Sequence, residues 1–338
     1  MILKTGRYHR CIYLMLFLCC MVLFTSSCNP NSTEAKLTQI NVACFPNVTH
    51  AQALLMKGQG TLEQAFEESG VSINWITFNA GPSQIEALFA GAVDIGFIGP
   101  VPAVSGYIQS SGDLHVIAGA SNGGSVLVAR EGSGILTAGD LDGRTVAIPQ
   151  FGNTQHFSLL AILADNGLEP TTHGGTVSIV PSTNADIANL MDRGDIDAAL
   201  VPEPWGSILE LRRGARVILD FDEVDPSGIP ATAIVIVRRD FMDAYPDAVA
   251  RFIEAHKETT AYLNDNPDSA MRIINSQIAE ITHFPIEYDV LESAFRRLQI
   301  TYEIPTSSIM DFAQIGVDEG LLPRLPDGSL AIYTFIRG

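Results

Sequence analysis

Two turns in the sequence carry residues that could bind a small ligand. The turn Ala80–Ser83 precedes a helical pattern, and the turn Gly99–Pro100 follows the short apolar run that comes next. In open α/β sheets, ligands bind beyond the carboxyl ends of strands, where such turns gather. A third turn holds Asn47 and Thr49, and the helix that it opens would present exposed N–H groups to an anion. We therefore predict a binding site whose walls are turns that open helices.

Catalytic and metal-binding interpretations have weaker support. Residues 119–123 match the G-x-S-x-G pattern of a hydrolase, with Ser121 as the nucleophile. Such an elbow must pass from a strand into a helix, whereas Ser125–Val128 begins another strand, which disfavours a hydrolase. The histidines after the N-terminal segment are scattered, without the spacing of metal ligands. We expect no catalytic residue, no metal and no cofactor.

The elements that must position these turns form a pattern that occurs twice. Residues 78–100 read as a turn, a helix that ends at Gly91, a strand and a second turn. Residues 181–205 repeat this order, with Gly194 at the end of the helix. The same alignment pairs two acidic residues that we interpret as fixing the corner from helix to strand, Asp94 and Asp197. The repeat predicts an α/β protein with two lobes of similar build.

The N-terminal segment, residues 1–27, has the layout of a signal peptide. Basic residues precede the apolar run Cys11–Phe24, which is too short for a comfortable membrane span. Small residues then lead to Cys28, which resembles the lipobox of bacterial lipoproteins, although Thr25 stands where such motifs usually have leucine. We predict lipidation of Cys28 and a tether over residues 28–36. The alternative is an ordinary cleaved signal in which Cys28 is incidental.

Composition limits the possible functions. The chain has 338 residues, enough for two domains with real cores, and a formal net charge of −18. This charge argues against nucleic acid as a partner, since nucleic-acid binding needs basic stripes. It does not exclude an anionic ligand, because a buried site responds to local donors. Of the five cysteines, only Cys44 lies beyond the signal and its lipidation site, so no disulfide framework is possible.

The predicted strands divide the chain into lobes. We assign residues 37–128 and 232–338 to lobe I and residues 129–231 to lobe II. Two segments, near residues 126–130 and 232–236, should cross between the lobes and act as a hinge.

Four segments, in order, resemble the substrate-binding proteins of nitrate/sulfonate/taurine-type ABC importers, the aliphatic-sulfonate-binding group in particular. They are PNVTHAQAL, FNAGPSQIEALFAGAVDIGFIGP, DLDGRTVAIPQFGNTQ and GDIDAALVPEPW, within residues 38–240. The resemblance implies a type II periplasmic-binding-protein fold, in which two crossing strands join two α/β lobes and a ligand cleft lies between. It also implies a permease and an ATPase as partners. With the lipid anchor, it indicates a monomer held at the cell envelope.

Carried over position by position, the resemblance implies a set of cleft residues. They are Asn47, Thr49, His50, Gly81, Ser83, Gly99, Ser121, Asn153, Thr154, Gln155, Glu203 and Trp205. Neutral hydroxyl and amide donors at helix N-termini suit a sulfonate or nitrate, whose charge is spread over three oxygens. The cleft loops contain no arginine or lysine, which disfavours a phosphate dianion.

Several of these residues also have structural interpretations. Asn153 and Ser83 could merely cap helices, and Trp205 could lie in the core and not over an apolar part of the ligand. Glu203 would repel an anion, so it would either accept from a ligand amine, as in taurine, or pair with a basic side chain. His50 could be a first-turn residue, although we favour the cleft.

The function predicted from the sequence is capture of an organosulfonate by a non-enzymatic, lipid-anchored binding protein of an ABC importer. Alternative ligands are nitrate, bicarbonate and a thiamine-pyrimidine precursor. The thiamine-pyrimidine synthases that border on this family are marked by a cysteine-rich motif, which this sequence lacks.

Overall fold

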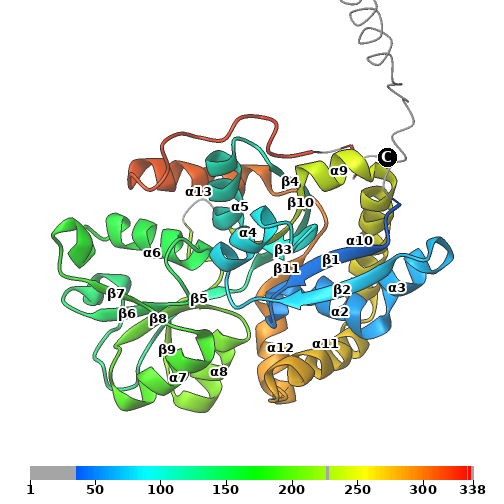
Figure 1. The fold of residues 1–338 in the computed structure, drawn as a ribbon. Coiled ribbons are helices and arrows are strands. Elements are labelled where there is room, and N and C mark those ends of the chain that lie inside the picture. Colours follow the sequence, from blue (N-terminus) through cyan, green and yellow to red (C-terminus); the bar gives the residue numbers. More distant parts are fainter. Residues whose placement is uncertain (1–35, 226–227, 333, 336–338) are drawn as a thin grey trace, which may run out of the picture. The chain divides into compact units, whose positions relative to one another are not determined.

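The computed structural model describes residues 36–225, 228–332 and 334–335. The predicted signal peptide, Cys28 and all but the last residue of the predicted tether lie outside the described residues. Leu37–Gly338 forms one structural unit, in which two β-sheets are packed with helices (Figure 1). No helix within the described part of the chain is both long and apolar enough to cross a membrane.

The first sheet has six strands in the order β11-β4-β10-β3-β1-β2. Strands β1, β2 and β3 run parallel, whereas β10 runs antiparallel to β3 and β4. Parallel neighbours require helical crossovers, which explains why apolar runs alternate with helical patterns in the sequence. The strands are β1 (Gln39–Cys44), β2 (Ser72–Thr77), β3 (Ile95–Ile98), β4 (Leu114–Gly123), β10 (Ala231–Arg238) and β11 (Leu298–Ile300).

The second sheet has five strands in the order β7-β6-β8-β5-β9. It repeats the plan of the first, because β6 runs parallel to β7 and β8 while β5 runs antiparallel to β8 and β9. The strands are β5 (Ser125–Ala129), β6 (Thr145–Ile148), β7 (Ser178–Pro181), β8 (Ala198–Pro202) and β9 (Arg216–Leu219). The repeat in the sequence therefore corresponds to two similar α/β lobes.

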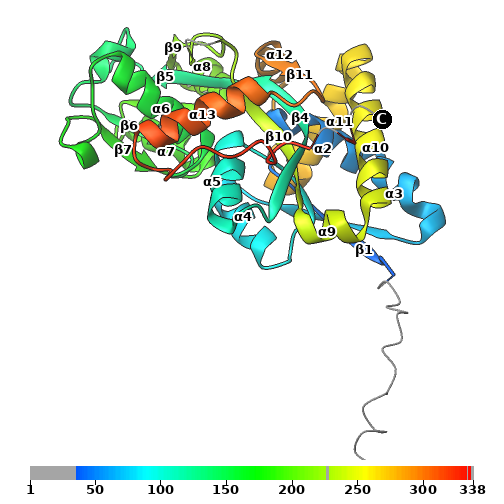
Figure 2. The same cartoon turned by 90° about the horizontal axis from the view of Figure 1, so that it is seen from above.

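Helices accompany each sheet. Those of the first lobe are α2 (Ala51–Gln59), α3 (Thr61–Phe66), α4 (Gly81–Phe89), α5 (Pro100–Ser110), α9 (Arg239–Ala244), α10 (Pro246–Asp265), α11 (Pro267–Thr282), α12 (Tyr288–Arg296) and α13 (Thr306–Asp318), with the 3₁₀ turns η1 (Val48–His50) and η2 (Glu67–Ser69). Those of the second are α6 (Thr154–Asp165), α7 (Asn184–Arg193) and α8 (Trp205–Arg213), with η3 (Ala138–Leu141) and η4 (Thr171–His173). Helix α13 contacts both α5 and α6, so the C-terminal part of the chain touches both lobes (Figure 2).

The first crossing between the lobes lies earlier than we expected. Residues 125–128 were assigned to lobe I, but β5 pairs along its whole length with β8 of the second sheet. The chain instead crosses at Gly123 and Gly124, whose φ angles of 74° and 73° are ones that glycine adopts without strain. The second crossing ends at Pro230, whose carbonyl accepts from the N–H of Gly123 at 2.7 Å. The two crossings are therefore adjacent.

The core of the second lobe shows why β5 belongs to it. Val126 and Val128 pack with α7 and α8 on one face of the sheet, and Leu127 and Ala129 pack with the other cluster on the opposite face. All these side chains are fully buried. A strand buried on both faces needs partners on both edges, which β8 and β9 supply.

The predicted corners are confirmed. Gly91 and Gly194 follow α4 and α7 with φ angles of 73° and 75°. Asp94 and Asp197 each hydrogen-bond to the backbone N–H of a neighbouring parallel strand. Neither carboxylate lines the cavity described below.

Candidate functional site

A small cavity lies where the two lobes face each other. Its volume is about 30 Å³, so it has room for a small polar group but not for a carbon skeleton. Eight of the predicted site residues line it: Asn47, Thr49, His50, Gly81, Gly99, Asn153, Thr154 and Gln155. No lining side chain among the described residues is charged, and His50 is the only titratable one.

Four helices begin at this cavity. Gly81 starts α4 and Gly99 is the N-cap of α5 in lobe I, while Thr154 starts α6 and Asn184 starts α7 in lobe II. The first-turn N–H groups of a helix have no partner within the helix, and the helix dipole is positive at this end. Helices α4 and α5 contribute less, because Pro82 and Pro100 in their first turns have no backbone N–H. The cavity is therefore electropositive without holding a formal positive charge.

The amide side chains of lobe II are oriented by hydrogen bonds. The Oδ1 of Asn153 accepts from the backbone N–H of His156 at 2.8 Å, so Asn153 does cap α6. Its Nδ2 donates to Oε1 of Gln155 at 3.0 Å, and Gln155 Nε2 donates to Ser125 Oγ at 2.9 Å. Each amide nitrogen carries two hydrogens, so one hydrogen on each is left for a ligand. Asn153 therefore caps α6 and still has one amide hydrogen free to donate.

Thr154 supplies a donor that the protein leaves without a partner. Its side chain is 4% exposed, and its Oγ1 makes no hydrogen bond within the described structure. Gly99 faces it from lobe I so closely that a Cβ on Gly99 would lie 2.3 Å from this oxygen. The glycine therefore permits the approach of the two lobes at this point.

His50 is a neutral donor. It is buried, its ring stacks on Phe45 at 4.3 Å, and burial lowers its pKa to about 3. The backbone N–H of Phe45 donates to Nδ1 at 3.2 Å, so the hydrogen of the neutral ring sits on Nε2. The ring can therefore donate one hydrogen bond from Nε2 but adds no charge.

Two predicted serines lie away from the cavity. Ser83 is the third residue of α4, is exposed, and makes no side-chain cap, because the N-cap position belongs to Ala80. Ser121 is fully buried in β4, and its Oγ donates to the carbonyl oxygen of Thr49 at 2.8 Å. Ser121 therefore supports the backbone of a lining residue. It stands in mid-strand, so the strand-to-helix elbow of a hydrolase is not formed.

Glu203 is also outside the cavity, and the basic partner considered from the sequence is Arg297. Arg297 Nη1 lies 3.0 Å from Glu203 Oε1, and Ser207 donates to the carboxylate from its N–H and its Oγ at 3.0 Å. Burial raises the pKa of Glu203, and these partners oppose the rise. Burial lowers the pKa of Arg297, but Glu203 and two further carboxylates raise it by more, so it stays charged. Glu203 is therefore not available to a ligand amine.

Trp205 reaches across the lobes at the edge of the cavity. Its Nε1 donates to Oδ1 of Asn47 at 3.2 Å. The ring is half-buried and faces a groove of about 750 Å³, which we call the Trp205 groove and which also includes Phe284 and Ile208. Asn47, Asn79 and Asn184 line both the cavity and this groove, so the two spaces adjoin beside this hydrogen bond.

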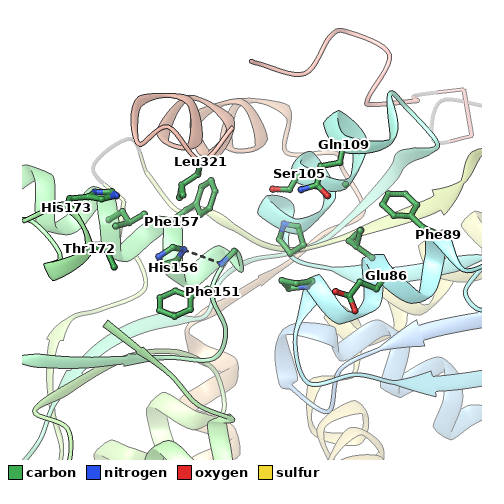
Figure 3. Close-up of a pocket in the computed structure, with 16 residues that line it drawn as sticks. Glu86, Phe89, Ser105, Gln109, Phe151, His156, Phe157, Thr172, His173 and Leu321 are labelled. Atoms are coloured by element: carbon green, nitrogen blue, oxygen red, sulfur yellow. Dashed lines mark hydrogen bonds between the residues drawn. The ribbon is translucent and has the colours of Figure 1, made fainter. Parts of the chain in front are cut away.

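A second groove flanks the cavity on another side. It is about 650 Å³ and is lined from α4 and α5 of lobe I and from α6 of lobe II, and we call it the α4–α6 groove. Figure 3 shows Phe151, His156 and Phe157 along one wall and Glu86 and Phe89 along the other. No prediction from the sequence concerned this groove.

Sequence reasoning missed some residues of the cavity, of which Asn79 and Asn184 are polar and belong to the two repeated turns. Asn79 directly precedes the Ala80–Ser83 turn. Asn184 opens α7 in the matching turn of lobe II, and its buried Oδ1 has no hydrogen-bond partner among the residues that the structure describes. The internal repeat was the signal that could have found Asn184, because it makes this turn the counterpart of Ala80–Ser83.

Comparisons with known proteins agree with this architecture. The NMT1-like family matches residues 33–278. The taurine-binding periplasmic protein of Escherichia coli is 30% identical over 270 residues, 77% of this chain and 81% of that protein. A putative aliphatic sulfonates-binding protein of Bacillus subtilis is 23% identical over 310 residues, 90% of this chain and 88% of that protein. The alkanesulfonate-binding protein SsuA from Xanthomonas axonopodis, solved with MOPS, has the same fold, with a TM-score of 0.72, 21% identity, and coverage of 86% of this chain and 96% of that one.

Proposed function

Because the chain belongs to the NMT1-like family, we propose that it is the substrate-binding protein of an ABC importer and captures a small oxyanion between its lobes. The favoured ligand is an organosulfonate. The observation that carries the proposal is the convergence of helix N-termini and neutral side-chain donors from both lobes on one cavity without charged side chains. The taurine- and sulfonate-binding relatives support the same class of ligand.

The donor set matches a singly charged oxyanion. Thr154, one amide hydrogen each from Asn153 and Gln155, and Nε2 of His50 can each address an oxygen that carries a fraction of one charge. A hydrogen bond to a charged group contributes about 1.5–3 kcal/mol. A phosphate dianion would be left with uncompensated charge in a buried site, which is costly without a cation. The cavity therefore favours a singly charged oxyanion over a doubly charged one.

The contacts of Glu203 and the excess of donors in the cavity bear on which other ligands could bind. Nitrate and bicarbonate offer similar oxygens but no carbon skeleton, so the same donors would bind them, and they remain the second candidates. A taurine-like ligand would lack a partner for its amine at Glu203, because Arg297 and Ser207 already occupy that carboxylate. A thiamine-pyrimidine precursor would need acceptors for its ring donors, whereas the oriented groups of the cavity are mainly donors.

Capture would involve closure about the paired crossings. Gly123 and Gly124 can change conformation at low cost, and Thr232 Oγ1 donates to the carbonyl oxygen of Gly123 beside the second crossing. A permease and an ATPase would then receive the closed, monomeric protein. Small-angle scattering should show compaction when the ligand binds, and an unchanged radius of gyration would count against closure.

Periplasmic relatives support a location in the cell envelope, and we propose that lipid on Cys28 holds the protein at the membrane. Cys28→Ser should move the protein from the membrane fraction to the soluble fraction. A wild-type protein that is already soluble after fractionation would contradict the anchor.

Calorimetric titration tests the ligand. Alkanesulfonates, taurine, nitrate, bicarbonate and a pyrimidine precursor would each be added to the purified protein. We expect sulfonates to bind most tightly. Tight binding of a neutral or cationic heterocycle, with no response to any sulfonate, would overturn the oxyanion proposal and leave the importer proposal standing.

A further inference from the structure

We propose that Arg297 is the pivot of lobe closure: it holds lobe II beside the hinge glycines, so that the donors of the two lobes meet in register at the cavity. Arg297 follows α12 and precedes β11, so its backbone belongs to lobe I. The inference rests on the proposed function, because it assumes that the lobes close on a ligand. Arg297 would then be a positioning residue, which acts on binding without touching the ligand.

The guanidinium of Arg297 uses all five of the N–H groups that an arginine side chain offers. Nε and Nη2 donate to the two carboxylate oxygens of Asp220 at 2.7 and 3.3 Å. Nη2 also donates to Glu210 at 2.9 Å, and Nη1 donates to Glu203 and Ser207 at 3.0 and 3.1 Å. All four partners belong to α8 or to the ends of β8 and β9 in lobe II. One side chain of lobe I therefore joins the lobes by five hydrogen bonds.

Burial and charge oppose any rearrangement of this joint. The side chain of Arg297 is 9% exposed, and that of Glu203 is not exposed at all. Separating a buried pair leaves a charge without solvent, which is strongly unfavourable. One cation also faces three carboxylates, which would repel one another if the arginine moved away. The joint should therefore stay intact while the lobes move.

The joint lies at the hinge itself. A Cβ on Gly123 would lie 2.6 Å from the carbonyl oxygen of Arg297, and a Cβ on Gly124 would lie 2.4 Å from Leu298 Cδ2. Arg297 and its neighbour are therefore packed against both glycines of the first crossing. Residues beside the axis of a hinge move least when it closes, so contacts at this place can persist in the open and the closed state.

Glu203 connects the joint to the cavity. Its N–H donates to the carbonyl oxygen of Gly124 at 2.7 Å, and the residue before it, Pro202, lines the cavity. Trp205 follows two residues later and donates to Asn47 of lobe I. By holding Glu203 against the hinge, Arg297 determines where the end of β8 and the start of α8 lie when the lobes meet.

Arg212 provides a matched control. Helices α8 and α12 lie side by side, and Arg212 near the end of α8 pairs with Glu287 and Asp289 at the start of α12 (Figure 1). These contacts also join the lobes, but they lie about 15 Å from Arg297 along α12. The two carboxylates are 71% and 62% exposed, so these pairs can separate at little cost.

The test compares two arginines that join the same pair of helices. Glu203→Gln and Arg297→Met in one chain remove the pivot without leaving a buried charge. Arg297→Lys keeps the charge but has three donors on one nitrogen, and it carries the same comparison if the double variant does not fold. Arg212→Met removes the outer contacts. For each variant, calorimetry gives the affinity for every ligand of the screen, and urea unfolding gives the stability.

We expect the double variant and Arg297→Lys to bind every ligand about tenfold more weakly, because only a fraction of the molecules would reach the binding-competent arrangement. Small-angle scattering should show a larger radius of gyration for these free variants than for the wild type, and less compaction at saturating ligand. Arg212→Met should bind within twofold of the wild type and scatter like it. A uniform factor distinguishes a pivot from a group that touches the ligand, whose loss would change the order of the ligands.

Two results would overturn the inference. Wild-type affinity and scattering in the Arg297 variants, with a lower free energy of unfolding, would make Arg297 a structural residue only. An equal loss of affinity in Arg212→Met would mean that the whole contact between α8 and α12 holds the closed state. If the wild type binds no ligand of the screen, the proposed function itself fails, and the radius of gyration of the free variants still decides whether Arg297 is the pivot.

Discussion

The two lobes fix their central corners with the same hydrogen bonds. In lobe I, the N–H of Asn41 in β1 donates to Oδ2 of Asp94 at 2.8 Å, and Nη2 of Arg238 in β10 lies 2.7 Å from Oδ1. Arg238 also donates from Nε to the carbonyl oxygen of Val93 at 3.3 Å. Asp94 thereby joins both neighbours of β3 to the turn that leads into this strand.

In lobe II, the equivalent residues make the equivalent contacts. The N–H of Thr145 in β6 donates to Oδ2 of Asp197 at 3.1 Å, and Nη2 of Arg130, the residue that directly follows β5, lies 3.3 Å from Oδ1. Arg130 Nε donates to the carbonyl oxygen of Ile196 at 3.2 Å. The order of strands around the corner is the same, so the same groups meet.

Burial is where the corners differ. The side chain of Asp94 is 7% exposed and that of Asp197 is 22% exposed, and the contacts of Asp94 are shorter. Ion pairs open to water contribute little, whereas breaking a buried pair leaves a charge without solvent. Topology therefore decides which groups meet, and burial decides how much their contact contributes to the stability of the fold.

The helix starts at the cavity differ as well. Lobe I places Gly81 and Gly99 there, which offer backbone and close approach. Lobe II places Asn153 and Thr154 at the start of α6, and these offer side-chain donors. The lobes are alike in architecture and complementary in the chemistry that they present to the cavity.

Breaking the two corners should give unequal losses of stability. We expect Asp94→Ala to lower the free energy of unfolding by about 3 kcal/mol, because Arg238 and the N–H of Asn41 lose a buried partner. Asp197→Ala should cost about 1 kcal/mol. Urea unfolding of both variants measures the difference. Equal losses would show that burial does not distinguish the corners.

Gly99→Ala should act on binding. The new Cβ would lie 2.3 Å from Thr154 Oγ1 and would hold the lobes apart. We expect the affinity for the best-bound ligand of the calorimetric screen to fall at least tenfold, with little change in the unfolding temperature of the free protein. Thr154→Ala in the same chain should recover part of the loss, because it removes the clash. Additive losses in the double variant would mean that the two residues do not meet in the closed state.

Variants of Asn153 can separate helix capping from ligand binding, two roles that the sequence alone left open for this residue. Asn153→Ala should cost about 1 kcal/mol of stability, because α6 loses its cap, and should also weaken binding. Asn153→Asp keeps the acceptor and so the cap, but it removes the donor and adds a negative charge. This variant should unfold with the same free energy as the wild type, but its affinity for the anion should be lost. Full binding by Asn153→Asp would exclude this amide from the site.

The smallest effect concerns acid stability. Burial lowers the pKa of His50 to about 3 and that of His256 to about 4, whereas the ordinary value is 6.5. The unfolded chain therefore binds protons first, and stability falls as the pH drops from about 6.5 toward 4. Between pH 7 and pH 6, His50 and His256 should each lower the free energy of unfolding by about 0.7 kcal/mol. Both residues are in lobe I, and urea unfolding of His50→Gln at the two pH values should show a shallower loss than the wild type.

Local signals in the sequence determined the elements and their order. The apolar run Thr145–Ile148 forms β6, because an apolar run between turns has few other solutions. Gly91 and Gly194 end helices because glycine adopts positive φ without strain. Matching order in the two halves determined that there are two lobes, and the turns that open helices contain eight of the cavity residues.

Contacts between distant residues were decided only by the tertiary structure. The strand β5 joined the second sheet because its partner β8 lies about 70 residues further along, and nothing within β5 itself identifies that partner. Glu203 was ambiguous until Arg297 was brought to it from 94 residues away. Trp205 and Asn47 meet only because the lobes face each other. A residue's type states what it can bond to, and packing determines which of those partners comes within reach.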